Sequence, residues 1–199
     1  WIEASNHVMW KLDLANPTHR WIVYGKYEGP AFIDWARDHL RADGTIVDSG
    51  ANIGQMLLYL ARFVPRGQVL AYEPHPEARA WLEECLAQNP QLPVHVLPFA
   101  LGARTADLYL SPKGTPELHG AWSQVSESAG IPIRVARLDG ELARLGIETV
   151  DLWKLDVEGY EQAALEGAEP LLRRHAIRAI YAELGFGHGE AIVAYLRER

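Results

Sequence analysis

The sequence of 199 residues contains a single cysteine, Cys85. One cysteine excludes a disulfide framework and a zinc site built on cysteines, and we expect a reducing, cytoplasmic setting. Positive charge is also scarce, because 19 Lys and Arg stand against 26 Asp and Glu, a formal net charge of -7. This balance disfavours a nucleic-acid-binding module, which needs basic residues for phosphate contacts. No apolar run approaches the ~18 residues of a membrane-spanning helix, so no membrane span is expected.

What is present is the composition of an ordinary globular domain, with 48% hydrophobic and 23% charged residues. Residues 1–43 differ from the rest of the chain. Residues 7–14 and 20–24 alternate loosely around the turn signal Asn16-Pro17, which predicts a short hairpin, and a helix is expected after Gly29-Pro30. We interpret residues 1–43 as an N-terminal hairpin and helix, separate from a main domain at residues 44–199.

From residue 44 onward, short β-rich runs alternate with helical patterns. This order predicts an α/β fold with a doubly wound, mostly parallel sheet and helices on both faces. A loop is expected at residues 111–130. The expected strands are residues 45–47, 68–72, 94–97, 107–110, 131–135, 150–155 and 177–184, and the expected helices are residues 53–64, 76–88 and 160–174.

In such a fold, ligands bind at the carboxyl ends of the strands, so the residues that follow each strand are the candidate site. The first strand runs into a turn that contains Asp48, Gly50, Asn52 and Gly54, and its glycines allow a ligand to approach the backbone closely. The second strand ends at Glu73, whose carboxylate can accept two hydrogen bonds from a ribose diol.

Asp48 helps to choose between cofactors. A dinucleotide would bring a pyrophosphate to this turn, and the Asp48 carboxylate would repel it. S-adenosylmethionine carries no phosphate, and its ammonium and sulfonium groups are cationic. Asp48 and Glu73 around a glycine turn therefore favour this methyl donor over a nicotinamide cofactor.

The fourth strand ends in a second group of charged residues. Lys154, Asp156 and Glu158 alternate along the chain and would share one face if the strand continued that far, and Glu183 follows the fifth strand. A lysine between two carboxylates limits their repulsion and can orient them.

These segments resemble the FkbM-type methyltransferases over roughly residues 44–185. The matching stretches are residues 47–54, Tyr72-Glu73-Pro74, Ala100-Leu101-Gly102, Leu138-Asp139, residues 154–161 and residues 165–168. The resemblance implies a Rossmann-like class I methyltransferase that uses S-adenosylmethionine, and better-known members methylate hydroxyl oxygens on natural products and sugars. The sequence departs from the family at residues 111–130, and class I folds commonly add two strands after the fifth.

The resemblance also implies roles for residues. Asp48, Gly50, Asn52 and Gly54 would border the methionine part of the cofactor, Glu73 would hold the ribose, and Phe99 and Ala100 would lie by the adenine. Pro74, next to Glu73, would also contact the cofactor. Asp156 and Glu158 would face the methyl group and the acceptor. Residues 1–43 would act as a cap or an acceptor-binding segment, with Tyr27, Glu28 and Trp122 as candidates for acceptor contact.

An acceptor hydroxyl needs its proton removed as it attacks, and the sequence leaves the base open. Asp156 or Glu158 could be that base, or a histidine such as His75 or His119. A less favoured alternative is a divalent ion such as Mg²⁺ held by Asp156, Glu158 and Glu183.

The expected partner is a small hydroxylated acceptor, and the hairpin could pair across a homodimer. Two other functions remain open: an NAD-dependent oxidoreductase on the same fold, and a non-catalytic cofactor-binding module. The first is weakened by Asp48 and by the lack of a Tyr-x-x-x-Lys pair after the fourth strand.

Overall fold

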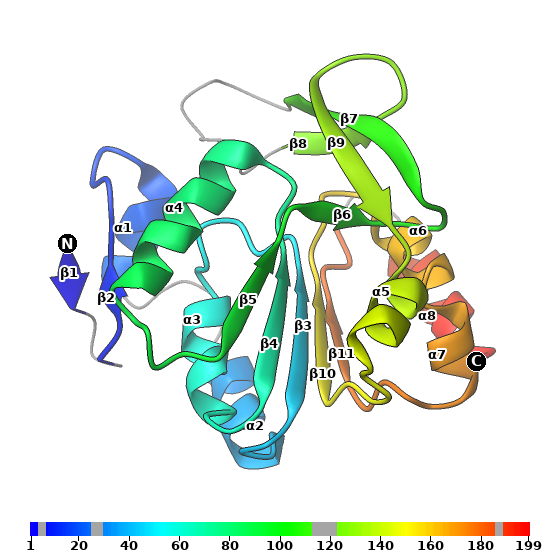
Figure 1. Cartoon of the computed structure of the whole chain (residues 1–199), viewed down its shortest axis with the longest axis horizontal. Helices are drawn as coiled ribbons and strands as arrows, with labels where there is room; N and C mark the ends of the chain where they lie inside the picture. Colours follow the sequence, from blue (N-terminus) through cyan, green and yellow to red (C-terminus); the bar gives the residue numbers. More distant parts are fainter. Residues whose placement is uncertain (4–6, 25–29, 113–122, 186–188) are drawn as a thin grey trace.

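The computed structural model describes residues 1–3, 7–24, 30–112, 123–185 and 189–199. Within them a five-stranded sheet has the order β11-β10-β3-β4-β5, and every neighbouring pair is parallel. The strand order reverses between β3 and β10, which is the point where an open α/β sheet offers a crevice to ligands. The predicted doubly wound parallel sheet is confirmed (Figure 1). The strands are β3 (Thr45–Ser49), β4 (Gln68–Tyr72), β5 (Val94–Leu97), β10 (Leu152–Leu155) and β11 (Ile180–Ala182).

Helices cover both faces of this sheet, because successive strand residues point to opposite sides. Ile46 and Leu152 belong to one hydrophobic cluster, whereas their neighbours Val47 and Trp153 belong to another. The first cluster packs against α2 (Pro30–His39), α3 (Leu57–Leu60) and α4 (Pro76–Ala87). The second packs against α5 (Leu138–Leu145), α6 (Glu161–Glu166), α7 (Glu169–Arg173) and α8 (Gly189–Arg197).

A second sheet lies beyond the carboxyl ends of the main strands, at the top of Figure 1. Its order is β6-β9-β7-β8, with β6 and β9 parallel and the other pairs antiparallel. The sequence predicted β7 (Ala106–Pro112) and β9 (Ile131–Ala136) but missed β6 (Phe99–Leu101) and β8 (Ser123–Ser126). The interpretation of residues 111–130 as a loop is wrong for β8, which pairs with β7. The helix α5 was also missed.

The predicted N-terminal hairpin is wrong in its second half. The strand β2 (Met9–Trp10) pairs instead with β1 (Ile2–Glu3), and residues expected as a strand form the helix α1 (Pro17–Val23). The Asn16-Pro17 signal marks the start of this helix, because proline is well suited to a first helical position, and the Asn16 carbonyl accepts a hydrogen bond from Arg20 N–H at 3.2 Å.

The N-terminal segment packs on the main sheet. Trp10 is fully buried in the same cluster as Ile46 and Leu57. Trp81 of α4 donates its indole N–H to the Lys11 carbonyl at 2.6 Å, and Met9 N–H donates to Asn89 Oδ1 at 2.9 Å. The described residues of this N-terminal segment therefore share a core with the sheet, and contact between residues 1–43 and an acceptor stays a prediction.

Two predicted helices are shorter than expected. The pattern over residues 53–64 yields α3 and a 3₁₀ turn, η1 (Ala61–Phe63), and the pattern over residues 160–174 divides into α6 and α7. The division falls at Gly167, where an added Cβ would lie 2.1 Å from the Gly102 carbonyl oxygen. The end of α6 therefore packs directly against the end of β6.

Candidate functional site

The glycine turn after β3 is packed directly against the segment after β10. Gly50 has a φ of 78°, and a Cβ at this position would lie 2.0 Å from the Asp156 carbonyl oxygen. The N–H groups of Gly50 and Ala51 both donate to the Tyr72 carbonyl, at 3.0 and 3.2 Å, so the turn is also fixed to the end of β4. The close packing and the left-handed backbone explain why glycine is needed here.

The turn continues through two more left-handed residues. Asn52 has a φ of 50°, and its side-chain oxygen accepts the N–H of Ile53 at 2.8 Å. Gly54 has a φ of 92°, and a Cβ there would lie 2.8 Å from Leu82 Cδ1 of α4. Asn52 therefore shapes the turn with its own side chain, as an asparagine in this conformation often does.

Glu73 is a buried carboxylate held by backbone N–H groups. It follows β4 and is 6% exposed. One carboxylate oxygen accepts the N–H of Asn52 at 2.7 Å, and the other accepts the N–H of His75 at 2.7 Å. Burial raises the pKa of Glu73 from 4.5 to about 7, although the two N–H groups act in the opposite direction. Each oxygen keeps further acceptor capacity, so the carboxylate can still receive hydroxyl donors.

Lys154 joins the carboxylates of the first and fourth strands. Its ammonium lies 3.2 Å from Asp48 Oδ1 and 3.4 Å from Asp156 Oδ2, and it donates to the Gly50 carbonyl at 3.1 Å. Asp48 and Lys154 are buried, whereas the Asp156 side chain is 27% exposed. Burial raises the pKa of Asp48, and Lys154 opposes this rise. The predicted alternation of Lys154 and Asp156 thus brings them together, beside the glycine turn.

The segment after β10 forms a tight turn that the sequence did not resolve. Glu158 has a φ of 57° and Gly159 a φ of 97°. Glu161, 3% exposed, accepts the N–H groups of Val157 and Gly159 at 3.0 and 3.1 Å. Gln124 of β8 donates its amide N–H to the Glu158 carbonyl at 2.8 Å.

Glu161 and Gln124 are therefore supporting residues that sequence reasoning missed. A glutamate in the first turn of an expected helix is a capping signal that could have indicated Glu161. Gln124 lies in the strand that was taken as a loop, and no local signal pointed to it.

The residues expected near the ribose and adenine lie apart from this charged group along the chain. Pro74 is partly buried and follows Glu73. Phe99 packs against the hydrophobic cluster that contains Leu70 and Tyr72 of β4, and the Arg134 guanidinium lies 5.3 Å from its ring centre. Ala100, 7% exposed, contributes its side chain to the core of the second sheet.

The structure bears differently on the two histidines predicted as alternative bases and on the three carboxylates predicted as metal ligands. His75 is buried at the start of α4, burial lowers its pKa, and its Nδ1 has no hydrogen-bond partner among the described residues. His119, Tyr27, Glu28 and Trp122 lie outside the described residues. Across the described ranges, no three His, Cys, Asp or Glu side chains gather in a way that could hold a metal ion, so Asp156, Glu158 and Glu183 do not form such a group. Nor does any helix in those ranges have the length and apolar character needed to cross a membrane.

The strand order, with polar site residues at the carboxyl ends of the strands, defines a Rossmann-like fold of the class I methyltransferase type. A solved methyltransferase FkbM from Methylobacillus flagellatus KT has this fold, with a TM-score of 0.58 and 20% identity, and the match covers 80% of this chain and 38% of that chain. The family model described as the methyltransferase FkbM domain matches residues 48–199. The chain belongs to the FkbM methyltransferase family, an enzyme family, and the predicted resemblance is confirmed.

Curated relatives carry methyltransferase names as well. Methyltransferase sdnD of Sordaria araneosa is 31% identical over 164 residues, which cover 66% of this chain and 62% of that protein. The 2-O-methyltransferase NoeI of Sinorhizobium fredii (strain NBRC 101917 / NGR234) is 24% identical over 159 residues, which cover 72% of this chain and 64% of that protein. The chain thus spans less than two thirds of the length of these relatives.

Proposed function

We propose that the chain binds S-adenosylmethionine at the carboxyl ends of β3, β4 and β10 and transfers its methyl group to a hydroxyl oxygen. The acceptor class is a small molecule, sugar or glycolipid. The observation that carries this proposal is the group of Asp48, Lys154 and Asp156 beside the glycine turn. With all three ionised, two carboxylates and one ammonium leave one net negative charge, which suits a cationic donor and opposes a pyrophosphate.

The residues of this edge fit the cofactor in a second way. Glu73 presents a buried carboxylate whose two oxygens each accept one backbone N–H, at 2.7 Å. A carboxylate held in this manner is pre-oriented, and its remaining lone pairs can accept both hydroxyls of a ribose. Gly50 and Gly54 let the turn pack closely against the Asp156 carbonyl and Leu82, which fixes the shape of the turn where the methionine part would lie.

The chemistry requires alignment and the removal of one proton. S-adenosylmethionine supplies a methyl group on a positively charged sulfur, which is an activated leaving group. Asp156 would accept the proton of the acceptor hydroxyl as its oxygen takes the methyl group, and the sulfur would leave as the neutral thioether of S-adenosylhomocysteine. Asp156 suits this task because its carboxylate is partly exposed, whereas Asp48 is 1% exposed. Lys154 holds the Asp156 carboxylate in position at 3.4 Å.

The choice of oxygen as the methylated atom draws support from a relative. NoeI is named a 2-O-methyltransferase, and it aligns over 72% of this chain. A reducing, cytoplasmic setting is also part of the proposal, and it rests on the single cysteine, which is buried and free.

The proposal is tested by methyl transfer from radiolabelled S-adenosylmethionine to a panel of hydroxylated small molecules and sugars. Asp156→Asn should lower turnover by about 100-fold or more and leave the affinity for S-adenosylhomocysteine within about twofold. The matched control is Asp43→Asn, an exposed aspartate before β3 that pairs with Arg41. Full activity of Asp156→Asn would remove Asp156 as the base. Cofactor binding without transfer to any acceptor would favour the non-catalytic alternative.

A further inference from the structure

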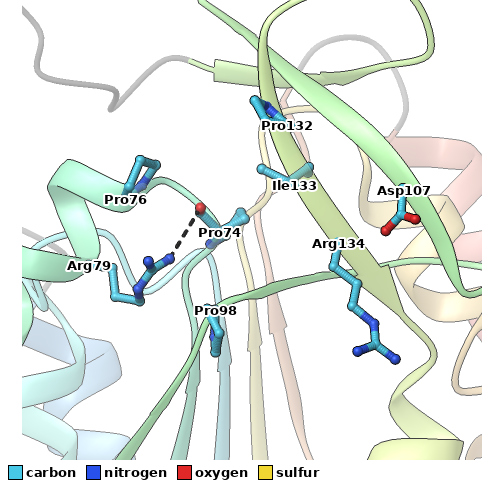
Figure 2. A pocket seen from close by; sticks show the side chains of 8 residues that line it. All are labelled: Pro74, Pro76, Arg79, Pro98, Asp107, Pro132, Ile133 and Arg134. Carbon is cyan, nitrogen blue, oxygen red and sulfur yellow. Dashed lines mark hydrogen bonds between the residues drawn. The ribbon is translucent and has the colours of Figure 1, made fainter.

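An open cleft of about 370 Å³ lies between the start of α4 and the second sheet (Figure 2). Of the residues predicted to hold the cofactor, Pro74 alone lines it, so the cleft borders the proposed ribose site and extends away from it. The lining residues are Pro74, Pro76, Arg79, Pro98, Asp107, Pro132, Ile133 and Arg134.

The walls of the cleft are largely apolar. Four prolines and Ile133 line it, and a proline offers no backbone N–H to a ligand. The polar character of the lining therefore comes mainly from its three charged side chains. Arg79 comes from α4 on one wall, and Arg134 and Asp107 come from β9 and β7 on the other (Figure 2).

Both guanidinium groups have donors to spare. Arg79 NH1 reaches the carbonyls of Glu73 and Pro74 at 3.4 Å each, which is the outer limit of a hydrogen bond, and Arg79 Nε is 3.9 Å from Glu83. Within the described part of the chain, the Arg134 side chain makes no hydrogen bond or ion pair, and its guanidinium lies over the Phe99 ring. Arg134 and Asp107 are register partners, so the carboxylate lies across the strand pair from it.

The cleft brings two arginines and one aspartate together, although the chain as a whole has a net charge of -7. Guanidinium groups recognise phosphate through paired N–H donors, and phosphate has enough oxygens to accept from two walls at once. Asp107 would repel the phosphate itself, but it can accept a hydrogen bond from a hydroxyl carried by the same ligand. The two positive charges and the one negative charge therefore match a hydroxylated, phosphate-bearing molecule.

We propose that this cleft binds the phosphate group of a hydroxylated ligand through Arg79 and Arg134. Two sources share this chemistry: the acceptor itself, or a separate phosphorylated metabolite. The binding site does not depend on the proposed reaction, whereas its assignment to the acceptor rests on the proposed function.

The test is a titration with inorganic phosphate at constant ionic strength, followed by the NMR signals of the arginine Nε–H groups. The wild-type chain should show shifts that saturate with phosphate. Each of the variants Arg79→Gln and Arg134→Gln should bind phosphate about tenfold more weakly. The control is Arg66→Gln. Arg66 is exposed and lies in the turn before β4, at the end of the sheet opposite the cleft, so this variant should bind phosphate as the wild type does. Arg79→Lys keeps the charge without the planar fork and should fall between Arg79→Gln and wild type.

Shifts that do not saturate, or wild-type affinity in both arginine-to-glutamine variants, would overturn the proposal. S-adenosylhomocysteine is titrated into the same samples, so that loss of the cofactor site is distinguished from loss of the phosphate site. The melting temperature of each variant shows whether it is folded.

A turnover assay separates the two sources. If the acceptor carries the phosphate, phosphorylated sugars should be methylated in preference to their unphosphorylated forms, and Arg79→Gln should abolish the preference. If the phosphate belongs to a separate metabolite, both forms should react equally while phosphate still binds. A phosphate preference that survives in both arginine-to-glutamine variants would contradict the proposed site.

Discussion

Lys154 Nζ lies 3.2 Å from Asp48 Oδ1, and both side chains are almost wholly buried. The two residues are register partners on β10 and β3, so the pair crosses the point where the strand order reverses. Burial raises the pKa of Asp48, and the ammonium of Lys154 is the main influence that opposes this rise. The pair therefore stabilises the charges that the proposed site needs.

Removal of the lysine should be costly. Lys154→Met leaves Asp48 as an uncompensated buried carboxylate, and we expect the free energy of unfolding to fall by about 3–5 kcal/mol. Urea unfolding at neutral pH measures the change. The double variant Asp48→Asn, Lys154→Met removes both charges and should recover a large part of the loss. An unchanged stability in Lys154→Met would contradict the account of this pair.

The need for glycine in the turn after β3 can be tested by comparing a tightly packed glycine with one that has open space around it. Gly50→Ala places a methyl group 2.0 Å from the Asp156 carbonyl oxygen in a left-handed backbone, so it should destabilise the fold and abolish S-adenosylhomocysteine binding. Gly140→Ala lies within α5, where an added Cβ meets nothing within 4 Å. This control should be neutral or more stable by up to about 1 kcal/mol. Thermal unfolding and calorimetry distinguish the two outcomes, and equal behaviour of the variants would be inconsistent with the geometry.

Glu73 should make stability depend on pH. Its pKa is raised from 4.5 to about 7, so between these values the folded state keeps a proton that the unfolded state has lost. Stability from this group is complete below pH 4.5 and is lost as pH rises through 7, by about 3 kcal/mol. Unfolding curves at pH 5 and pH 8 measure the slope. Glu73→Gln should flatten it, and an unchanged slope in this variant would show that another group titrates.

Glu161 should stabilise the turn that carries Asp156 and Glu158. Glu161→Ala leaves the N–H groups of Val157 and Gly159 without their acceptor, and we expect a loss of about 1–3 kcal/mol. Glu161→Gln retains a side-chain oxygen and should lose less. Urea unfolding gives the stabilities, and the methyl-transfer assay should show a lower kcat for the alanine variant. A wild-type kcat in a folded Glu161→Ala chain would show that this turn does not contribute to methyl transfer.

The sequence predicted the parts of the fold that local patterns encode. Apolar β-rich runs marked β3, β4 and β5 closely, and the positions of Asp48, Glu73 and Asp156 at the ends of expected strands indicated the edge where they lie. The short strand β6 follows β5 after a single residue, Pro98, so periodicity offered no boundary between them. The Asn16-Pro17 dipeptide suits both a turn and a helix start, and tertiary packing decides between them.

The contacts of the site depend on the fold and were not readable from the chain. Lys154 reaches Asp48 and Gly50 because β10 lies beside β3, although 104 residues separate Lys154 from Gly50. Gln124 reaches the Glu158 carbonyl across 34 residues from a strand that the sequence did not predict. Pairings at such separations are fixed by strand order and register, which a single sequence leaves open.

The central claim is that this edge of the sheet binds S-adenosylmethionine. The most direct measurement is a calorimetric titration of the purified chain with S-adenosylhomocysteine and, separately, with NAD, for the wild type and for Glu73→Gln. We expect micromolar binding of S-adenosylhomocysteine, no binding of NAD, and about tenfold weaker S-adenosylhomocysteine binding when the Glu73 carboxylate is lost. Binding of NAD without binding of S-adenosylhomocysteine would contradict the account.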